Sequence, residues 1–261
     1  MPFTLLYFTA CTEQRQTSLI HTADEKIQQA NYPEAVELLK KAIALNPESR
    51  ASLKAIYKLG FTLESYMKDI EGALFNYQEF IRLSQDRVAI YEVQKRIANL
   101  YFEQLRDSER AIGAYKRLIS FSQDSLETDF FQYRIAQSYF RQNNFDQARY
   151  EYQQLMEKFP KSQYLARARF EVGNTYYMQA KYDIAIEALK QVLRYHPQSE
   201  FATEAQFLMG ECYEQQEKLQ NALQIYENIV GKYPSADVLN YRISELRKRL
   251  KAATKQVPVV H

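Results

Sequence analysis

The sequence has few of the residues that a metal centre, a redox site or a phosphate-binding loop requires. Among 261 residues there are three histidines, two cysteines, six glycines and no tryptophan. His21, His196 and His261 have no carboxylate or cysteine at metal-ligand spacing, and Cys11 and Cys212 are too distant in sequence for a redox or zinc motif. No glycine-rich phosphate loop or nucleophile elbow occurs. We therefore expect no enzyme activity, no cofactor and no bound metal.

Long apolar runs and charge of one sign are also missing. No run of 18 apolar residues is present, so the sequence predicts no transmembrane helix in the mature chain. A formal net charge of +2 with 25% charged residues indicates a mixed surface and does not favour nucleic-acid binding. Because only six glycines and seven prolines occur, long helices are expected rather than strands and turns.

What the sequence does contain is a period of 37 residues between positions 130 and 234. Ala148, Ala185 and Ala222 mark it, each 12 residues after another small residue. Two antiparallel helices approach closely only where one side chain is small, so each block predicts a helix A and a helix B. The other recurring members are the small residues Ala136, Gly173 and Gly210, the tyrosines Tyr139, Tyr176 and Tyr213, the large residues Tyr152, Leu189 and Tyr226, and Pro160, Pro197 and Pro234.

The period continues towards the N-terminus in weaker form. Helix B anchors at Ala35, Ala73 and Ala111 extend the series with steps of 38, 38 and 37, which predicts six pairs over residues 16–234. The regular third-to-fourth step indicates no domain break. In the second and third pairs the anchor spacing is 13, and we expect the extra residue in the turns 67–72 and 106–110.

The segments between pairs carry Pro and Ser, as in residues 160–166. We expect these segments to add a turn to the start of the next helix A, with Ser162 and Ser199 as helix caps. His196 is expected to cap the end of a helix, and Cys212 to be a half-buried structural thiol.

Residues 235–261 follow the last proline. Leu239, Ile243, Leu246 and Leu250 recur at helical spacing and predict an amphipathic capping helix on the sixth pair. Its basic residues form either a solvated surface, which we favour, or a docking face for an acidic partner or anionic lipid headgroups. The tail, 256–261, is expected to be disordered.

The combined pattern resembles the tetratricopeptide repeat (TPR). The resemblance implies an all-α fold, an α-α superhelix (TPR solenoid) of about six antiparallel helix pairs plus a C-terminal capping helix. The proline-containing junctions resemble bacterial envelope TPR proteins, namely the lipoprotein of the β-barrel assembly machinery and the periplasmic protein that works with Tol-Pal. The first implies a protein-binding scaffold at the periplasmic face of the outer membrane. Alternatives are the Tol-Pal type, which usually has a coiled coil that this sequence lacks, and a cytosolic TPR adaptor.

The first 15 residues differ from the rest. An apolar run over residues 3–10 ends in small residues before Cys11, which resembles the end of a bacterial lipoprotein signal peptide. On that interpretation Cys11 carries a lipid anchor and contacts the membrane. The run lacks a preceding Lys or Arg, and Phe8 replaces the usual Leu. The alternative is an ordinary helix end with a buried cysteine.

The resemblance also implies a concave groove lined by helix A residues that binds an extended peptide of a partner protein. Several of these side chains could instead fill space between helices. A clamp for a terminal carboxylate is not expected, because Arg134 and Glu171 replace residues that such a clamp uses. The implied groove residues are Tyr57, Phe61, Lys95, Asn99, Phe102, Tyr133, Gln137, Phe140, Arg141, Phe170, Asn174, Tyr177 and Phe207.

Overall fold

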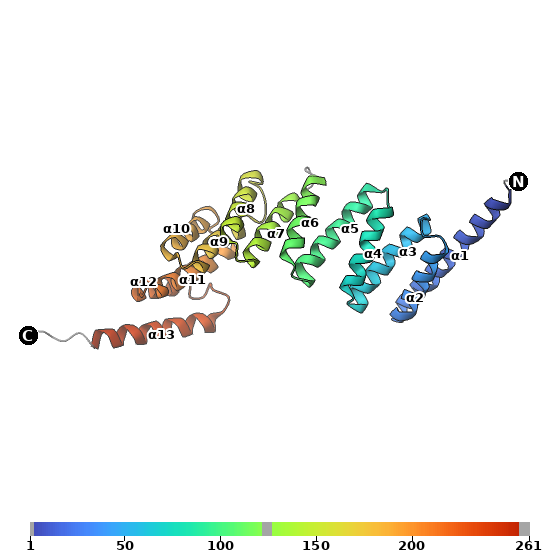
Figure 1. Cartoon of the computed structure of the whole chain (residues 1–261). Helices are drawn as coiled ribbons and strands as arrows, with labels where there is room; N and C mark the ends of the chain where they lie inside the picture. Colours follow the sequence, from blue (N-terminus) through green and yellow to red (C-terminus); the bar gives the residue numbers. More distant parts are fainter. Residues whose placement is uncertain (1–2, 122–126, 256–261) are drawn as a thin grey trace, which may run out of the picture. The chain divides into compact units, whose positions relative to one another are not determined.

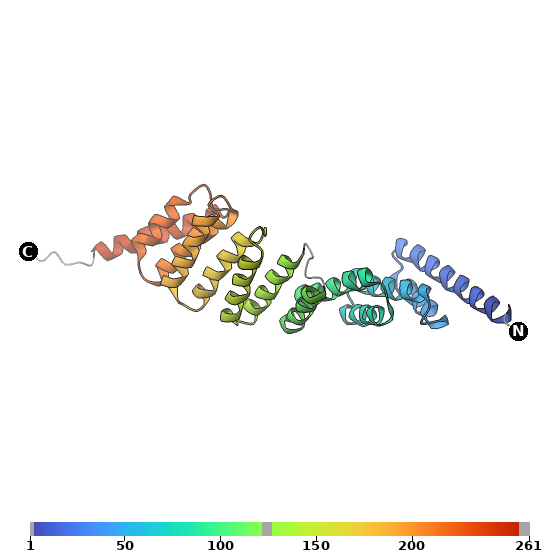
Figure 2. The same cartoon turned by 90° about the horizontal axis from the view of Figure 1, so that it is seen from above.

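A computed structural model describes residues 3–121 and 127–255, and all regular structure within those ranges is helical (Figures 1 and 2). The chain divides into two compact units, residues 1–121 and 122–261. The first contains α1 (Phe3–Gln28), α2 (Tyr32–Leu45), α3 (Arg50–Thr62), the π-helical turn η1 (Leu63–Met67), α4 (Ile70–Leu83), α5 (Arg87–Asn99), the π-helical turn η2 (Leu100–Gln104) and α6 (Ser108–Phe121).

The second unit contains three further helix pairs and one terminal helix. These are α7 (Thr128–Arg141), α8 (Phe145–Lys158), α9 (Leu165–Met178), α10 (Tyr182–Tyr195), α11 (Glu200–Gln215), α12 (Leu219–Asn228) and α13 (Ala236–Lys255). Six antiparallel pairs and a capping helix are therefore present, and the predicted fold class is confirmed. The six helix B anchors have no exposed surface: Ala35, Ala73, Ala111, Ala148, Ala185 and Ala222.

Close helix crossings explain the small residues of helix A. A methyl group on Gly210 would lie 2.3 Å from the ring of Tyr226, and one on Gly173 would lie 2.6 Å from the side chain of Leu189. Both distances are shorter than van der Waals contact, so the large residue of helix B occupies the space that a side chain would need. The pairing of a small residue with a large one is thus a packing requirement.

The extra residue of the second and third pairs does not lie in the turns, contrary to expectation. It is taken up by the π-helical turns η1 and η2 at the ends of these two A helices. The turns that follow, residues 68–69 and 105–107, are no longer than the turn 142–144 of the fourth pair. A π turn widens the helix by one residue per turn, so the insertion is absorbed without displacing helix B.

Each turn from helix A to helix B contains one left-handed residue. The set shares φ values between 53° and 59° and comprises Ala30, Lys68, Arg106, Asn143, Ala180 and Glu217. A left-handed residue ends a helix and reverses the chain within three residues, which brings helix B back along helix A. None of these positions is glycine, so the turn is set by the helices that flank it and was not visible from glycine content.

The junctions between pairs differ in part from the expectation. Residues 160–164 form turns and α9 begins only at Leu165, so no turn is added to that helix. Ser199 occupies the N-cap position of α11, but its hydroxyl donates to the carbonyl of His196 at 2.8 Å. The hydroxyl of Ser162 accepts from the amide of Tyr164 at 3.1 Å and donates to Asp129. These serines therefore shape the junction turns, and neither caps a helix with its side chain.

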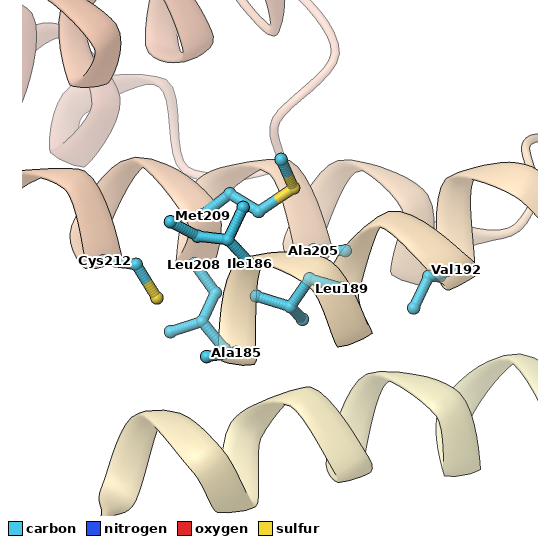
Figure 3. Close-up of a cluster of buried hydrophobic side chains, with 8 residues drawn as sticks. All are labelled: Ala185, Ile186, Leu189, Val192, Ala205, Leu208, Met209 and Cys212. Carbon is cyan, nitrogen blue, oxygen red and sulfur yellow. The ribbon is translucent and has the colours of Figure 1, made fainter. Parts of the chain in front are cut away.

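Apolar clusters join successive pairs within the second unit. One cluster combines residues of α10 and α11 (Figure 3): Ala185, Ile186, Leu189, Val192, Ala205, Leu208, Met209 and Cys212. Cys212 is fully buried, deeper than expected, and burial raises the pKa of its thiol to about 12. The thiol is thus a packing group.

The division between the third and fourth pairs was not expected. The anchors on either side, Ala111 and Ala148, keep the 37-residue step, yet the compact units separate between Phe121 and Ser122. The step is a spacing along the sequence, and it does not predict where the compact units separate.

The N-terminal segment is helical as far as it is described. The backbone of α1 includes Cys11, but the side chains of residues 3–11 lie outside the described part, so the lipidation prediction is not tested. The predicted disordered tail, 256–261, also lies outside it. Among the described helices none has the length and apolar character needed to span a bilayer.

Candidate protein-interaction surfaces

The first unit contains a polar cleft of about 370 Å³ beside the two π turns. Its walls come from the end of α3 with η1 and from α5 with η2, which are consecutive A helices. The lining residues are Glu64, Glu92, Lys95, Arg96, Asn99, Leu100, Glu103 and Gln104. Two of the residues predicted for a groove, Lys95 and Asn99, therefore lie together in an actual cleft.

The two walls of the cleft are held together by an ion pair. Arg96 donates to both carboxylate oxygens of Glu64, at 3.1 and 2.9 Å, and Tyr77 of α4 donates its hydroxyl to the same carboxylate at 2.5 Å. The guanidinium also lies 5.2 Å from the centre of the Phe61 ring. The Glu64 carboxylate thus joins η1, at the end of α3, to α4 and to α5, and it fixes the spacing of the two walls.

The wall formed by α5 and η2 offers groups that can bind a peptide backbone. Asn99 is exposed and accepts a hydrogen bond from the hydroxyl of Tyr115 at 2.8 Å, which orients its amide. Gln104 ends η2 and is exposed. Lys95 lies 5.1 Å from the Tyr91 ring and forms an ion pair with Glu92. Amides and a cation between apolar stems suit an extended chain.

In the second unit the predicted groove rings serve a different purpose. Tyr133 stacks on Tyr164 with ring centres 5.1 Å apart, and Phe207 stacks on Tyr233 at 4.4 Å. Phe170 lies 5.9 Å from Phe201. In each case the second ring lies in the segment before the next helix or in the first turn of that helix. These rings join one pair to the next pair or to α13, as the space-filling alternative predicted.

Two predicted groove residues are buried and cannot line a surface. Phe102 is 1% exposed and packs edge-on to Tyr115, while Tyr133 is 3% exposed and lies between Tyr152 and Tyr164. Burial raises the pKa of Tyr133 above its ordinary value, with Glu171 adding to the shift. Their assignment to a groove was wrong because the family positions do not separate a ring that faces the groove from one that fills the crossing.

The remaining predicted residues are half-buried or exposed. Tyr57 packs against Tyr77 and Phe80, Phe61 meets Tyr66 edge-on, and Phe140 meets Phe145 edge-on. The other predicted residues are polar or carry a hydroxyl, and their side chains are partly or fully exposed. Gln137 accepts from Arg134 at 3.2 Å, Asn174 donates to Glu171 at 3.1 Å, Tyr177 is half-buried beside Tyr182, and Arg141 is exposed.

Carboxylates on α9 and α11 have perturbed ionisation. Burial raises the pKa of Glu171, and the hydrogen bond from Asn174 opposes the shift. Burial also raises the pKa values of Glu204 and Glu211, the latter despite its pairing with Arg242. Glu171 is 3.9 Å from Arg167.

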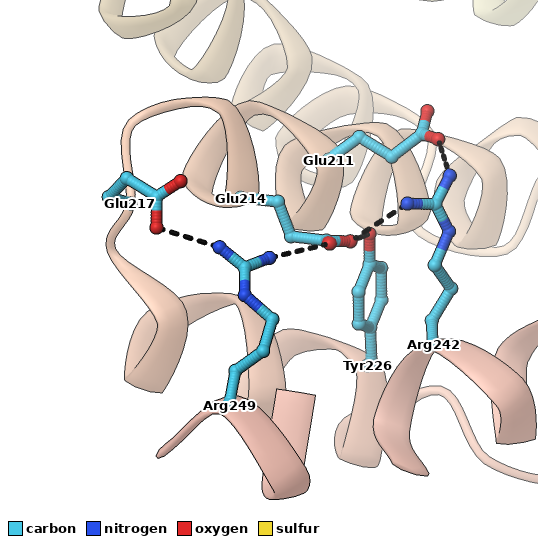
Figure 4. A network of polar contacts seen from close by, with 6 residues as sticks. All are labelled: Glu211, Glu214, Glu217, Tyr226, Arg242 and Arg249. Carbon is cyan, nitrogen blue, oxygen red and sulfur yellow. Dashed lines mark hydrogen bonds and ion pairs between the residues drawn. The ribbon is translucent and has the colours of Figure 1, made fainter. Parts of the chain in front are cut away.

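The basic residues of α13 are largely used inside the chain (Figure 4). Arg242 pairs with Glu211 at 2.9 Å and with Glu214 at 3.4 Å, and Arg249 pairs with Glu217 at 2.7 Å. The hydroxyl of Tyr226 donates to Glu214 at 2.7 Å. The sixth pair buries Leu239, Ile243 and Leu246, as predicted for a capping helix. These ion pairs fix α13 to α11 and reduce the charge available to a partner.

Sequence reasoning missed Glu64 and Arg96, and it missed the contacts of Glu214 with Tyr226 and Arg242. Their signal was present, because Gly60 and Gly210 are each followed four residues later by a glutamate and then by a tyrosine in helix B. His196 occupies the C-cap position of α10, as expected, and its backbone amide donates to the carbonyl of Val192 at 2.8 Å. Its ring accepts a hydrogen bond from Arg169 at 3.3 Å, which sequence reasoning did not predict. Burial and the Arg169 charge both lower the pKa of His196.

Comparison with known proteins agrees with this geometry. Two models described as tetratricopeptide repeat match residues 130–198 and 170–237. Residues 130–237 of this chain therefore consist of tetratricopeptide repeats. Comparison with curated proteins gives no significant match.

Several solved structures share the fold. A tetratricopeptide repeat protein from Parabacteroides merdae is 20% identical, with a TM-score of 0.55, over 93% of this chain and 88% of that one. The apo form of RapI is 13% identical, with a TM-score of 0.54, over 91% and 76% of the two chains. PilW, described as a type IV pilus biogenesis factor, is 12% identical, with a TM-score of 0.53, over 87% and 97%. At these identities the likeness establishes the fold alone. Arrays of tetratricopeptide repeats are scaffolds that bind other proteins, and the two family matches support this role for the chain.

Proposed function

We propose that this protein is a non-catalytic scaffold that binds an extended segment of a partner protein in the cleft of its first unit. The observation that carries the proposal is the pair of π turns, η1 and η2, which flank the cleft and supply Glu64 and Gln104 to its lining. π turns occur frequently at functional sites because they present side chains that a regular helix would not.

The chemistry of the cleft favours a peptide over a small apolar ligand. The described lining has one apolar residue, Leu100, among charged and amide side chains. Asn99 and Gln104 each offer a donor and an acceptor, which matches the alternating groups of an extended backbone. Arg96 and Glu64 neutralise one another, so the cleft can accept a backbone without a strong demand for charge.

A photocrosslinking experiment tests the proposal. A photoreactive phenylalanine replaces Gln104 in one variant and Gln85, exposed in the junction between α4 and α5 and not part of the cleft, in the control. The Gln104 variant is expected to crosslink to a discrete polypeptide, and the Gln85 control is not. Adding Lys95→Glu to the Gln104 variant should abolish the adduct. Equal adducts at both positions, or an adduct indifferent to Lys95→Glu, would contradict the assignment.

We also propose that the scaffold works in the cell envelope, with Cys11 as the site of lipid attachment. Support comes from the sequence: an apolar run over residues 3–10 precedes Cys11, and a polar run follows it. The favoured role resembles that of the outer-membrane protein assembly lipoprotein, with a Tol-Pal-type periplasmic protein as the alternative.

Mass spectrometry of the membrane fraction distinguishes the locations. An N-terminal diacylglyceryl-Cys11 peptide is the expected product, and Cys11→Ser should move the protein out of the membrane fraction. An unprocessed Met1 in the cytosol would instead support a cytosolic adaptor.

A further inference from the structure

A basic cluster lies at the end of α10 in the second unit. Arg169 of α9 stacks over the ring of Tyr195, with its guanidinium carbon 4.4 Å from the ring centre, and its Nε donates to Nε2 of His196 at 3.3 Å. The guanidinium carbon of Arg194 lies 5.5 Å from the centre of the same ring. Two guanidinium groups and an imidazole therefore lie around one tyrosine, whose side chain is largely open to solvent.

Neither arginine of this cluster has a carboxylate partner. Within residues 3–121 and 127–255, no aspartate or glutamate lies at ion-pair distance from Arg169 or Arg194. The pKa of His196 agrees with this, because burial and the Arg169 charge lower it and no described carboxylate opposes them. Each arginine of α13, by contrast, pairs with a glutamate. The cluster thus keeps two positive charges that the described part of the chain does not neutralise.

Comparison with the fourth pair shows which acidic residue is absent from the fifth. The fourth pair has Gln132 at the position of Arg169, and Gln132 donates to the carboxylate of Glu151 on helix B at 2.6 Å. In the fifth pair, the residue 37 positions after Glu151 is Ala188. The repeat pattern therefore supplies no acceptor for the arginine, and the packing of a helix pair does not require an arginine at this position.

The dipole of α10 accounts for only part of the cluster. The helix ends at Tyr195, and the C-terminus of a helix stabilises nearby cations with about half a negative charge. Half a charge does not neutralise two guanidinium groups. Arg169 is half-buried, so its guanidinium loses part of its hydration without gaining a counterion. An anion from outside the chain would supply that counterion.

We propose that this cluster binds a phosphate monoester, with Arg169 as the anchor and Arg194 as the second cation. A phosphate monoester carries a charge of about −1.5 to −2 at pH 7, which matches the two arginines. The planar guanidinium group also suits phosphate oxygens, and Arg169 keeps both Nη groups for them because its Nε contacts His196. A single carboxylate would leave one positive charge without a counterion, which favours phosphate over an acidic side chain.

Two neighbouring groups add donors to the site. Since Nε2 of His196 accepts from Arg169, the neutral ring carries its proton on Nδ1, which is a donor. The hydroxyl of Tyr195 has no hydrogen-bond partner among the described residues. A small phosphate ester and a phosphoserine of a partner protein present the same group to these donors, so the experiment distinguishes the two sources.

NMR of the full chain, labelled in histidine, tests the proposal. The sequence has three histidines, and the signal of His196 is identified by its loss in His196→Asn. At about pH 7.5, where phosphate is largely dianionic, inorganic phosphate should shift this signal saturably, whereas chloride at the same ionic strength should not. Arg169→Gln and Arg194→Gln should each weaken binding by about tenfold or more, because each removes charge-assisted hydrogen bonds. Arg247→Gln, at an exposed arginine that pairs with Glu227 at 2.7 Å, is the matched control and should leave the affinity unchanged.

The variants keep the inference falsifiable. Glutamine occupies the position of Arg169 in the fourth and sixth pairs, so Arg169→Gln should fold, and circular dichroism verifies this. Absence of a saturable shift, an equal response to chloride, or binding that neither arginine variant weakens would overturn the proposal. A phosphoserine peptide that binds more tightly than inorganic phosphate, and that Arg169→Gln weakens, would identify a partner protein as the source. Equal affinities would identify a small phosphate ester. The cleft of the first unit contains none of these residues, so the two proposals fail separately.

Discussion

A single methyl group added to Gly210 tests the packing rule on which the repeat depends. In Gly210→Ala the new carbon would lie 2.3 Å from Cε1 of Tyr226 and 2.7 Å from Cζ. The ring has no exposed surface and lies 5.2 Å from the ring of Phe207. Its hydroxyl is held by Glu214 at 2.7 Å. The ring cannot move aside without disturbing either the neighbouring ring or that hydrogen bond.

The expected magnitude follows from opposing effects. Overpacking a well-filled core costs about 1–3 kcal/mol. Loss of a hydrogen bond to a charged group costs about 1.5–3 kcal/mol if the ring does move. Alanine in place of glycine inside a helix gains about 1 kcal/mol. Whichever cost applies, we therefore expect Gly210→Ala to lower the free energy of unfolding by up to about 2 kcal/mol in net terms.

Gly113→Ala is the matched control, because it adds the same methyl group to a helix without a crossing. The nearest atom to that methyl group is a guanidinium nitrogen of Arg117 at 3.6 Å, an ordinary contact to a flexible side chain. Only the helix-propensity gain of about 1 kcal/mol remains, so this variant should be more stable than the natural chain. Urea denaturation followed by circular dichroism measures both. Equal stability of Gly210→Ala and Gly113→Ala would refute the crossing argument.

Three further predictions concern buried polar groups. The hydroxyls of Tyr77 and Tyr226 donate to carboxylates, so Tyr77→Phe and Tyr226→Phe should each lower the free energy of unfolding by about 1.5–3 kcal/mol. The hydroxyl of Tyr115 donates to an amide, so Tyr115→Phe should lower it by only about 0.5–1.5 kcal/mol. The same urea titrations measure these losses, and equal losses in all three variants would contradict the prediction. Burial raises the pKa values of Tyr77, Tyr133 and Tyr226, so stability should be full below about pH 10, where both states are protonated, and should fall as pH rises further and the unfolded state ionises first. Melting temperatures across alkaline pH measure the fall, the absence of tryptophan leaves tyrosinate absorbance unobstructed, and a flat profile would contradict the assignment. The buried thiol of Cys212, whose pKa is raised to about 12, should react with a thiol reagent only after unfolding, and rapid labelling of that residue in the native protein would show that its helix opens.

The sequence was sufficient for the helix pairs because their determinants are local. An alanine on helix B and a small residue on helix A are separated by 12 or 13 residues, and their spacing alone positions the crossing. The full burial of all six alanine anchors confirms this. The amphipathic spacing of Leu239, Ile243 and Leu246 predicted the capping helix for the same reason.

The features that sequence reasoning missed depend on contacts between pairs. The 13-residue spacing showed that one residue was extra, but a longer turn and a π turn absorb an insertion equally well in the sequence. Likewise, an aromatic ring at a groove position can face a ligand or pack against an aromatic ring near the start of the next helix. Tyr133, Phe170 and Phe207 do the second because an aromatic residue follows in each junction or first turn. That partner lies about 30 residues away and had to be seen in space.

The recurring glutamates show how pair formation and pair stacking are coupled. A tyrosine on helix B reaches across helix A, and its hydroxyl then needs an acceptor, which Glu64 and Glu214 supply. In the fifth pair, where helix B carries Leu189, no acceptor is needed and the equivalent position is Tyr177. Since each of these glutamates also holds an arginine of the following helix, one carboxylate secures both the crossing within a pair and the next helix in line. The same arrangement of Gly, Glu, Tyr and Arg therefore orders the cleft between α3 and α5 and fixes α13 to the sixth pair.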